Sequence, residues 1–267
     1  MRNIKELISL AGRVALITGG AGHIGSAMAE ALAEMGAHIA IVDISDKVSS
    51  GICEKIRREY KVRSLPVVAD LSLEERIRTI PGEVVAEYGR LDILINCAAL
   101  GGADPLPGWT TPFEEQSVDT WRRALDINLT ASFLLTQACS PALKKSGRGS
   151  IINVASIYGI QGPDMRLYEG TPMGNPAAYG ASKGGLLQLT RWLATVLAPH
   201  IRVNAISPGG VWRNQPEQFC DRYTDKTPLG RMATEEDLKG IAVYLASDLS
   251  AYVTGQNIIV DGGFSVW

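Results

Sequence analysis

The stretch Thr18-Gly19-Gly20-Ala21-Gly22-His23-Ile24-Gly25 decides the fold of this 267-residue chain. It follows the apolar run 14–17, which is typical of a buried strand, and it opens a segment that we interpret as a helix at 26–35. A strand, a glycine-rich turn and a helix in this order are the context in which such a turn binds a dinucleotide. Glycines let the backbone approach a diphosphate, whose charge then meets unpaired N–H groups at the helix start. A glycine-rich turn without any ligand is the alternative interpretation.

An acidic residue stands where a dinucleotide-binding unit would hold a ribose. Asp43 ends the second apolar run, 39–42, and lies 18 residues after Gly25. A carboxylate there can accept hydrogen bonds from the ribose hydroxyls, and it would repel a 2′-phosphate. Neither Ile44 nor Ser45 supplies a compensating cation. The sequence therefore favours NAD over NADP, against the alternative that Asp43 is a solvated residue at a strand end.

Short apolar strands and helices alternate along the rest of the chain. Further strands are expected before Val68 and at 92–95, 150–154, 202–206 and 257–260, and helices before Tyr60 and at 73–88, 118–145, 177–198 and 235–246. This alternation indicates a parallel sheet that is covered on both faces. No linker or composition shift divides the chain. We therefore predict one domain, 1–267, with a Rossmann fold of the α/β class and a doubly wound, seven-stranded parallel sheet.

Composition excludes several classes of partner. The net charge is −2 and the pI is near 6.0, so nothing indicates a nucleic-acid or acidic-membrane partner. Only three histidines are present and no Cys-x-x-Cys pair exists, so we expect no metal site. Cysteines read as buried thiols, and the absence of a run of 18 apolar residues favours a cytoplasmic protein. We expect a small-molecule substrate.

A tyrosine and a lysine share one helix face in the stretch Tyr179-Gly-Ala-Ser-Lys183. Their spacing of four places both side chains one turn apart. An ammonium group beside a phenol is expected to lower the tyrosine pKa from its usual value of about 10. Such a phenol can pass a proton to or from a substrate oxygen. The pair alone is weak evidence, because Tyr-x-x-x-Lys is common on exposed helices.

Taken together, these motifs resemble the short-chain dehydrogenase/reductase family over nearly the whole chain. The glycine turn is similar to that family's Thr-Gly-x-x-x-Gly-x-Gly, with His23 in place of the middle glycine. Four further stretches resemble family motifs: Asp70-Leu71 the adenine-contacting pair, Asn96-Cys97-Ala98-Ala99 the motif Asn-Asn-Ala-Gly, Pro208-Gly209 the turn beside the nicotinamide, and Asp261-Gly262-Gly263 the C-terminal signature. A threonine usually follows the Pro-Gly turn, whereas this chain has Val211-Trp212-Arg213-Asn214.

The resemblance implies an NAD(H)-dependent oxidoreductase that interconverts a secondary alcohol and a ketone. Tyr179 would be the general acid/base, Lys183 would hold the nicotinamide ribose, Ser156 would bind the substrate oxygen, and Asn128 would orient a water that passes the proton onwards. The catalytic residues would be Asn128, Ser156, Tyr179 and Lys183. The cofactor-binding residues would be Gly19, Gly22, His23, Ile24, Gly25, Asp43, Asp70, Leu71, Asn96, Ala98, Tyr179, Lys183, Pro208, Gly209 and Val211. The family also implies a homotetramer or homodimer. Capping and turn formation are the alternative roles for Asn128 and Ser156.

The segment between Ser156 and Tyr179 is longer than the family norm, and loops of this length are usually functional or disordered. Within it, Arg166 and Glu169 are candidate partners for a hydroxylated or charged substrate. A surface excursion that touches nothing is the alternative. This insert, together with Pro208-Gly209-Gly210 and Asn214-Gln215-Pro216, resembles a branch of the family linked to surface-polysaccharide and flagellin sugar biosynthesis. That resemblance implies a sugar or polyol derivative as substrate.

Aromatic residues in two loops are candidates for a lid or for stacking on a sugar. They are Trp109 in the loop 101–116, and Trp212 and Phe219 after Pro208. Packing is the alternative for each of them.

Three other functions compete. A reductase of a 3-oxoacyl thioester or a steroid would share every catalytic residue, although its pocket should be more apolar or ringed by cations. A dinucleotide-sensing protein without catalysis is disfavoured, because all four catalytic positions are filled. A nucleotide-sugar epimerase usually needs a substantial C-terminal substrate domain, and only residues 248–267 follow the last long helix.

Overall fold

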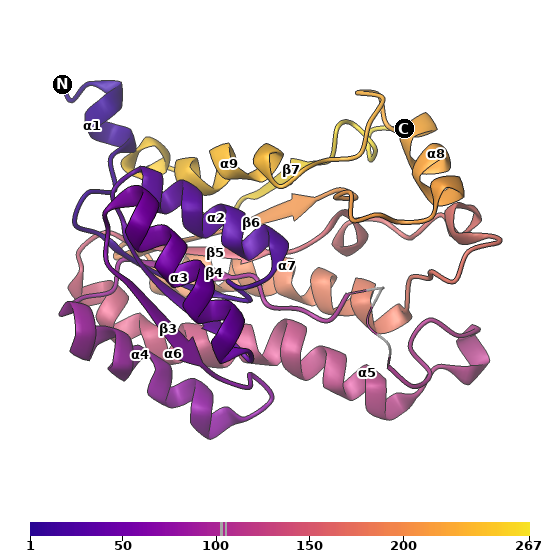
Figure 1. The fold of residues 1–267 in the computed structure, drawn as a ribbon, viewed down its shortest axis with the longest axis horizontal. Coiled ribbons are helices and arrows are strands. Elements are labelled where there is room, and N and C mark those ends of the chain that lie inside the picture. The colour runs from indigo at the N-terminus through magenta and orange to yellow at the C-terminus, as the bar shows by residue number, and fades with distance from the viewer. Residues whose placement is uncertain (102–103, 105) are drawn as a thin grey trace.

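The protein is described here by a computed structural model that covers residues 1–101, 104 and 106–267. Gly102, Ala103 and Pro105, in the 101–116 loop, lie outside the described residues. The described strands form one parallel sheet with the order β3-β2-β1-β4-β5-β6-β7 (Figure 1). They are β1 (Val14–Thr18), β2 (His38–Asp43), β3 (Ser64–Val68), β4 (Ile93–Asn96), β5 (Gly149–Val154), β6 (Ile201–Pro208) and β7 (Asn257–Val260). The predicted seven-stranded, doubly wound Rossmann sheet is confirmed.

Helices cover both faces of this sheet (Figure 1). One face carries α2 (His23–Glu34), α3 (Asp46–Tyr60) and α9 (Glu236–Ala246), and α2 packs against α9. The other carries α4 (Glu74–Tyr88), α5 (Val118–Leu125), α6 (Ala131–Lys145) and α7 (Ala177–Leu197). Two shorter helices, α1 (Ile4–Ile8) and α8 (Glu217–Asp225), lie outside these layers.

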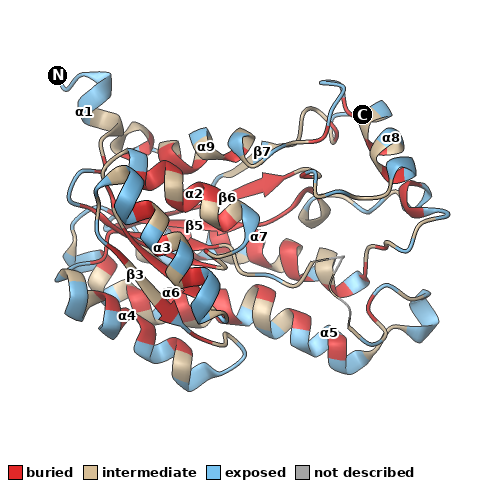
Figure 2. Ribbon diagram, viewed as in Figure 1, coloured by how far each residue is buried: buried red, intermediate tan, exposed pale blue. Residues whose placement is uncertain are grey.

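The strands and the helix sides that face them are buried (Figure 2). The sheet separates two hydrophobic clusters, and side chains along a strand alternate between them. In β1, Ala15 and Ile17 pack beneath α2 and α9, while Val14 and Leu16 pack beneath α4 and α6. This alternation follows from the two-residue period of a strand. Because both faces are covered, the strands read as continuous apolar runs, and each fully buried large aliphatic side chain contributes about 1.5–3 kcal/mol.

The predicted single helix at 118–145 is interrupted. α5 passes into a π-helical turn, Asp126–Thr130, before α6 begins. π-bulges of this kind are frequent at functional sites. Asn128 lies in this turn and is buried.

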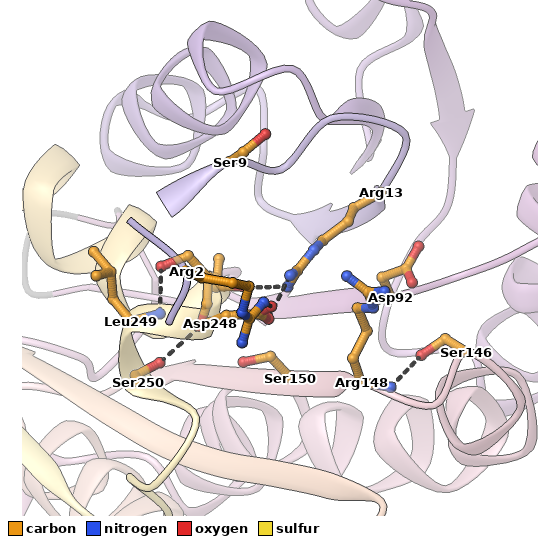
Figure 3. Close-up of polar contacts among 12 residues, drawn as sticks. Arg2, Ser9, Arg13, Asp92, Ser146, Arg148, Ser150, Asp248, Leu249 and Ser250 are labelled. Carbon is orange, nitrogen blue, oxygen red and sulfur yellow. Dashed lines mark hydrogen bonds and ion pairs between the residues drawn. The ribbon is translucent and has the colours of Figure 1, made fainter. Parts of the chain in front are cut away.

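Charged residues fasten the edge of the sheet opposite the carboxyl ends of the strands (Figure 3). Arg13, which immediately precedes β1, is buried and forms an ion pair with Asp248. Arg2 pairs with the same carboxylate at 2.5 Å, and Arg13 also donates to the carbonyl of Ala246 at 3.1 Å. These contacts join the N-terminal segment to the end of α9.

Two classes of site have no candidate among the described residues. No helix there is long and apolar enough to cross a membrane. No cluster of three or more His, Cys, Asp or Glu side chains that could hold a metal ion occurs in the same part of the chain.

Candidate active site

A cavity of about 730 Å³ opens at the carboxyl ends of the strands. The strand order reverses between β1 and β4, and ligands of open α/β sheets bind at this position. The cavity is lined by the loops that follow β1 to β6 and by the start of α7. The predicted site residues that line it are Gly19, Gly22, His23, Ile24, Gly25, Asp43, Asp70, Leu71, Ala98, Ser156, Tyr179, Lys183, Pro208, Gly209 and Val211.

Close backbone contacts that only glycine allows build the turn after β1. Gly19 has φ +60°, and a Cβ on it would meet the Cα of Ala98 at 2.8 Å. A Cβ on Gly25 would meet the carbonyl oxygen of Gly19 at 2.2 Å. α2 therefore starts directly beside β1, and its first N–H groups, which lack partners within the helix, belong to residues that line the cavity.

Replacing Gly25 with Ala is expected to lower the free energy of unfolding by about 3 kcal/mol, because the new methyl group displaces a backbone carbonyl rather than a flexible side chain. Urea unfolding followed by circular dichroism measures the change. Gly51→Ala in α3 is the matched control: no atom lies within 4 Å of a Cβ there, so it should stabilise by roughly 0.5–1 kcal/mol. Equal urea midpoints for Gly25→Ala and wild type would contradict this packing argument.

His23, which replaces a family glycine, does not fill the turn. Its side chain is 72% exposed, and its Nδ1 lies 3.6 Å from the Oε1 atom of Glu235. The space over Gly22 stays open, because a Cβ there would meet only the Gly19 carbonyl oxygen, at 3.2 Å. The turn therefore fits a dinucleotide diphosphate despite the substitution.

Asp43 connects the end of β2 to this turn. Its Oδ2 accepts a hydrogen bond from the Ala21 N–H at 3.1 Å, and its Oδ1 accepts one from the Ile44 N–H at 2.8 Å. The carboxylate also lines the cavity, beside Ile44, whose side chain is exposed. A ribose in the cavity would therefore meet a fixed hydrogen-bond acceptor and no cation from the adjoining residue.

Ser156, Tyr179 and Lys183 meet at the other end of the cavity. Ser156 follows β5, and its hydroxyl oxygen accepts from the Tyr158 N–H at 3.2 Å. Tyr179 and Lys183 lie one turn apart on α7, with the Lys183 Nζ 5.8 Å from the centroid of the Tyr179 ring. The Nζ donates to the Val154 carbonyl at 2.8 Å, which fixes the ammonium group beneath the site.

The comparisons with known proteins agree with this geometry. Residues 19–265 match a family model described as enoyl-(acyl carrier protein) reductase. The structure matches a short-chain type dehydrogenase/reductase from Mycobacterium marinum with a TM-score of 0.87, at 31% identity and with 99% of each chain covered. The chain belongs to the short-chain dehydrogenase/reductase family. It is an NAD(P)-dependent oxidoreductase that acts on CH–OH groups.

Two curated relatives are dehydrogenases. Trans-4-hydroxycyclohexanecarboxylate dehydrogenase from Sinomonas cyclohexanicum is 35% identical over 260 residues, which cover 95% of this chain and 93% of the relative. A probable galactose dehydrogenase, GalD, from Rhizobium meliloti (strain 1021) is 35% identical over 259 residues and 94% of each chain.

Solved structures in the family include both dinucleotides. A gluconate 5-dehydrogenase from Burkholderia cenocepacia, in complex with NADP and tartrate, matches with a TM-score of 0.88 at 29% identity, covering 99% of this chain and 100% of that one. An NAD⁺-bound xylitol dehydrogenase matches with a TM-score of 0.84 at 31% identity, covering 95% and 99%. A preference for one dinucleotide must therefore be argued from this chain's own residues.

The protonation of the Tyr179–Lys183 pair corrects one expectation for this short-chain dehydrogenase/reductase. Burial raises the pKa of Tyr179 above its usual value, and a hydrogen bond with Ser156 only partly offsets the rise. Burial also lowers the pKa of Lys183 to about 8, which leaves it mostly cationic at neutral pH. The expected lowering of the Tyr179 pKa is therefore not found: the net shift is upward, burial is its largest cause, and Lys183 is not among the groups that shift it.

Two predicted site residues do not line the cavity. The side chain of Asn128 accepts from the Leu100 N–H at 2.7 Å and donates to the Leu100 carbonyl and the Ser182 hydroxyl, both at 3.1 Å. Ser182 in turn donates to the Tyr179 carbonyl at 2.8 Å. Asn96 donates to Asn153 at 2.8 Å, between neighbouring strands. Both are therefore placed to support the site, while the water contact expected of Asn128 and the cofactor contact expected of Asn96 stay predictions.

Pro208 and Gly209 lie between the cavity and the C-terminal motif. The Gly209 N–H donates to the Val260 carbonyl at 2.9 Å, and a Cβ on Gly209 would meet Asp261 at 2.9 Å. The next N–H, of Gly210, donates to the Tyr223 hydroxyl at 2.5 Å. The resemblance of Asp261-Gly262-Gly263 to a family signature thus has a structural reason, since this stretch supports the cofactor-side turn.

The insert forms part of the cavity wall, through residues other than those expected. Arg166 pairs with Asp164 at 2.8 Å and is 80% exposed, and neither Arg166 nor Glu169 lines the cavity. The prediction of substrate contacts for these two residues is therefore corrected. The insert residues in the wall are Ile157, Tyr158, Tyr168, Met173, Gly174 and Asn175.

Three of these insert residues form a hydrogen-bonded chain. Asn175 Nδ2 donates to the Tyr168 hydroxyl at 3.3 Å, which donates to the Tyr158 hydroxyl at 2.9 Å. The proton of Tyr158 has no acceptor among the described residues, so it is free for a ligand. Burial raises the pKa of Tyr158, so the group stays a donor at physiological pH. No local sequence pattern pointed to this chain, because its three members are separated by ten and seven residues.

Two of the three aromatic residues considered for a lid are instead packed in the interior. Trp109 and Phe219 are buried, and Phe219 lies 5.3 Å from Tyr168 between ring centroids. Phe219 also lines the cavity, whereas Trp212 is exposed and does not.

Proposed function

We propose that this enzyme is an NAD(H)-dependent dehydrogenase that interconverts a secondary alcohol and a ketone on a sugar, polyol or similarly hydroxylated ring. The observation that carries the proposal is the Tyr158 hydroxyl, which accepts a hydrogen bond from Tyr168 at the end of the insert's hydrogen-bonded chain and keeps its own proton for a ligand beside Ser156 and Tyr179. A hydroxyl that accepts one hydrogen bond can still donate another. A substrate with a second hydroxyl near the reacting carbon supplies the acceptor.

The residues divide the chemistry among them. A nicotinamide dinucleotide, which the glycine turn, Asp43 and Lys183 would hold, would supply the hydride-transfer chemistry. In ketone reduction, Tyr179 gives its hydroxyl proton to the substrate oxygen; in alcohol oxidation it takes that proton back. Ser156 donates a hydrogen bond to the same oxygen and stabilises its charge. The Lys183 ammonium stabilises the tyrosinate that forms, and Asn128 holds α7 and the loop at Leu100 in register.

Asp43 supports NAD as the cofactor. Its carboxylate faces the cavity and is fixed by the Ala21 and Ile44 N–H groups, while the exposed side chain at 44 is apolar. A 2′-phosphate there would meet a negative charge and no cation from the adjoining residue. Assembly as a homotetramer or homodimer, a cytoplasmic location and the surface-polysaccharide branch stay predictions.

Replacing Tyr158 with Phe is expected to lower kcat/KM for polyhydroxylated substrates by about 10-fold and for cyclohexanol by less than about 2-fold. The variant removes one hydrogen bond to the second hydroxyl and leaves the reacting oxygen untouched. The test is a panel of aldohexoses, polyols, cyclohexanol and acetoacetyl-coenzyme A, assayed at 340 nm with both dinucleotides.

The panel separates the competing functions. Equal losses for cyclohexanol and the polyols would remove Tyr158 from substrate binding. Preferred turnover of acetoacetyl-coenzyme A would instead support the 3-oxoacyl reductase alternative. Failure of every sugar and polyol would refute the proposed substrate class.

A further inference from the structure

An arginine lies at the rim of the cavity beside the glycine turn. Val211 forms an isolated parallel bridge with Ala233, and the Trp212 N–H donates to the Ala233 carbonyl at 2.9 Å. This pairing brings Arg213 next to the start of α9, where its Nη1 lies 2.5 Å from the Oε1 atom of Glu235. Arg213 also lines the cavity, and 25% of its side chain is exposed.

Glu235 links this arginine to the first residue of α2. The same Oε1 atom that pairs with Arg213 lies 3.6 Å from the His23 Nδ1. The guanidinium group is therefore separated from the glycine turn by one carboxylate oxygen. Arg213 and Gly22 line the same cavity, and the arginine side chain is long and flexible.

The other lysine and arginine on the described cavity wall are engaged elsewhere. Lys183 is bound to the Val154 carbonyl at the catalytic end. Arg123 lies near Asp70, whose pKa its charge helps to lower. Arg213 is thus the cation at the glycine turn, where the N–H groups of α2 favour negative charge.

We propose that Arg213 binds the diphosphate of the dinucleotide, and that Glu235 competes with the diphosphate for it. The planar guanidinium fork suits two phosphate oxygens. Arg213 follows the Pro-Gly turn in the stretch where a threonine is usual in the family, so this chain supplies a full charge from that loop. The proposal goes beyond the proposed function, because both dinucleotides carry the diphosphate whatever the substrate.

Dissociation constants of NADH and ADP-ribose, measured by isothermal titration calorimetry, test the proposal without turnover. Arg213→Gln should weaken both ligands by roughly 10- to 100-fold, as expected for a lost charge-assisted hydrogen bond. Glu235→Gln should tighten both by about 2- to 10-fold, because it removes the competing carboxylate. The dissociation constants of Arg213→Lys should lie between those of wild type and Arg213→Gln, because lysine keeps the charge but lacks the planar fork.

The directions of these shifts decide between binding and simple support of the loop. If Arg213 only ties its loop to α9, both Arg213→Gln and Glu235→Gln weaken the two ligands, and the proposal is overturned. Weakening of NADH alone would place Arg213 at the nicotinamide and also overturn it. Arg231→Gln is the matched control: this arginine pairs with Asp237 of the same helix at 2.7 Å, outside the cavity, and its loss should change neither constant by more than about 2-fold.

Discussion

Tyr179→Phe is expected to lower kcat roughly 1000-fold or more in both directions, within the range that general acid–base catalysis contributes. The variant keeps the aromatic ring, whose centroid lies 5.8 Å from the Lys183 Nζ, and removes only the hydroxyl. Ser156 cannot replace it, because an alkyl hydroxyl gives up its proton far less readily than a phenol. The loss should appear in kcat, measured at 340 nm, because the proton transfer itself is removed.

Binding and folding controls separate this effect from structural damage. The NADH dissociation constant and the midpoint of thermal unfolding should match wild type, since the ring still fills its place on α7. Tyr60→Phe is the matched control, because Tyr60 hydrogen-bonds to Glu30 at 3.4 Å away from the cavity, and it should keep full activity. A Tyr179→Phe enzyme with more than a tenth of the wild-type kcat would refute the assigned role.

The sheet was readable from the sequence because its strands are buried on both faces. The 257–260 strand agrees at both ends, and the 14–17 run differs from β1 by one residue. Helix starts were less certain. α2 begins at His23 rather than 26, since the glycine turn itself supplies its first residues.

The π-turn at Asp126–Thr130 could not be read from local sequence. It depends on Asn128 contacting the backbone of Leu100, 28 residues away, and such a contact has no local signature. The sequence analysis missed α8, although this helix does have a local signature. Pro216 precedes it, and Phe219 and Tyr223 are spaced four apart, which is the apolar spacing of a short amphipathic helix.

At the site, residue spacing predicted which side chains lie together but not how their pKa values shift. Tyr179 and Lys183 were found because a helix brings residues four apart together. The direction of the tyrosine pKa shift was wrong, since the extent of burial depends on the whole fold. In the insert, charge drew attention to Arg166. Its pairing with Asp164 turns it outward, whereas the neighbouring Tyr168 faces the cavity.

Asp43 allows the cofactor preference to be inverted. Wild type is expected to favour NADH over NADPH by about 100-fold in kcat/KM, because a 2′-phosphate beside a fixed carboxylate costs several kcal/mol. Asp43→Asn keeps the shape of the side chain and its acceptor oxygen for the Ala21 N–H, and removes only the charge. It should bring the two cofactors within roughly 10-fold of each other, mainly through a lower KM for NADPH.

Adding Ile44→Arg to Asp43→Asn should carry the preference past equality, to about 10-fold or more for NADPH. Ile44 is exposed and lines the cavity directly after Asp43, so an arginine there has room to reach a 2′-phosphate. Ile44→Leu with Asp43→Asn is the matched control, since it repacks the same position without a charge and should leave the ratio where Asp43→Asn sets it. Equal use of NADH and NADPH by wild type would show that the Asp43 carboxylate does not face the ribose, and the argument for NAD would fail with it.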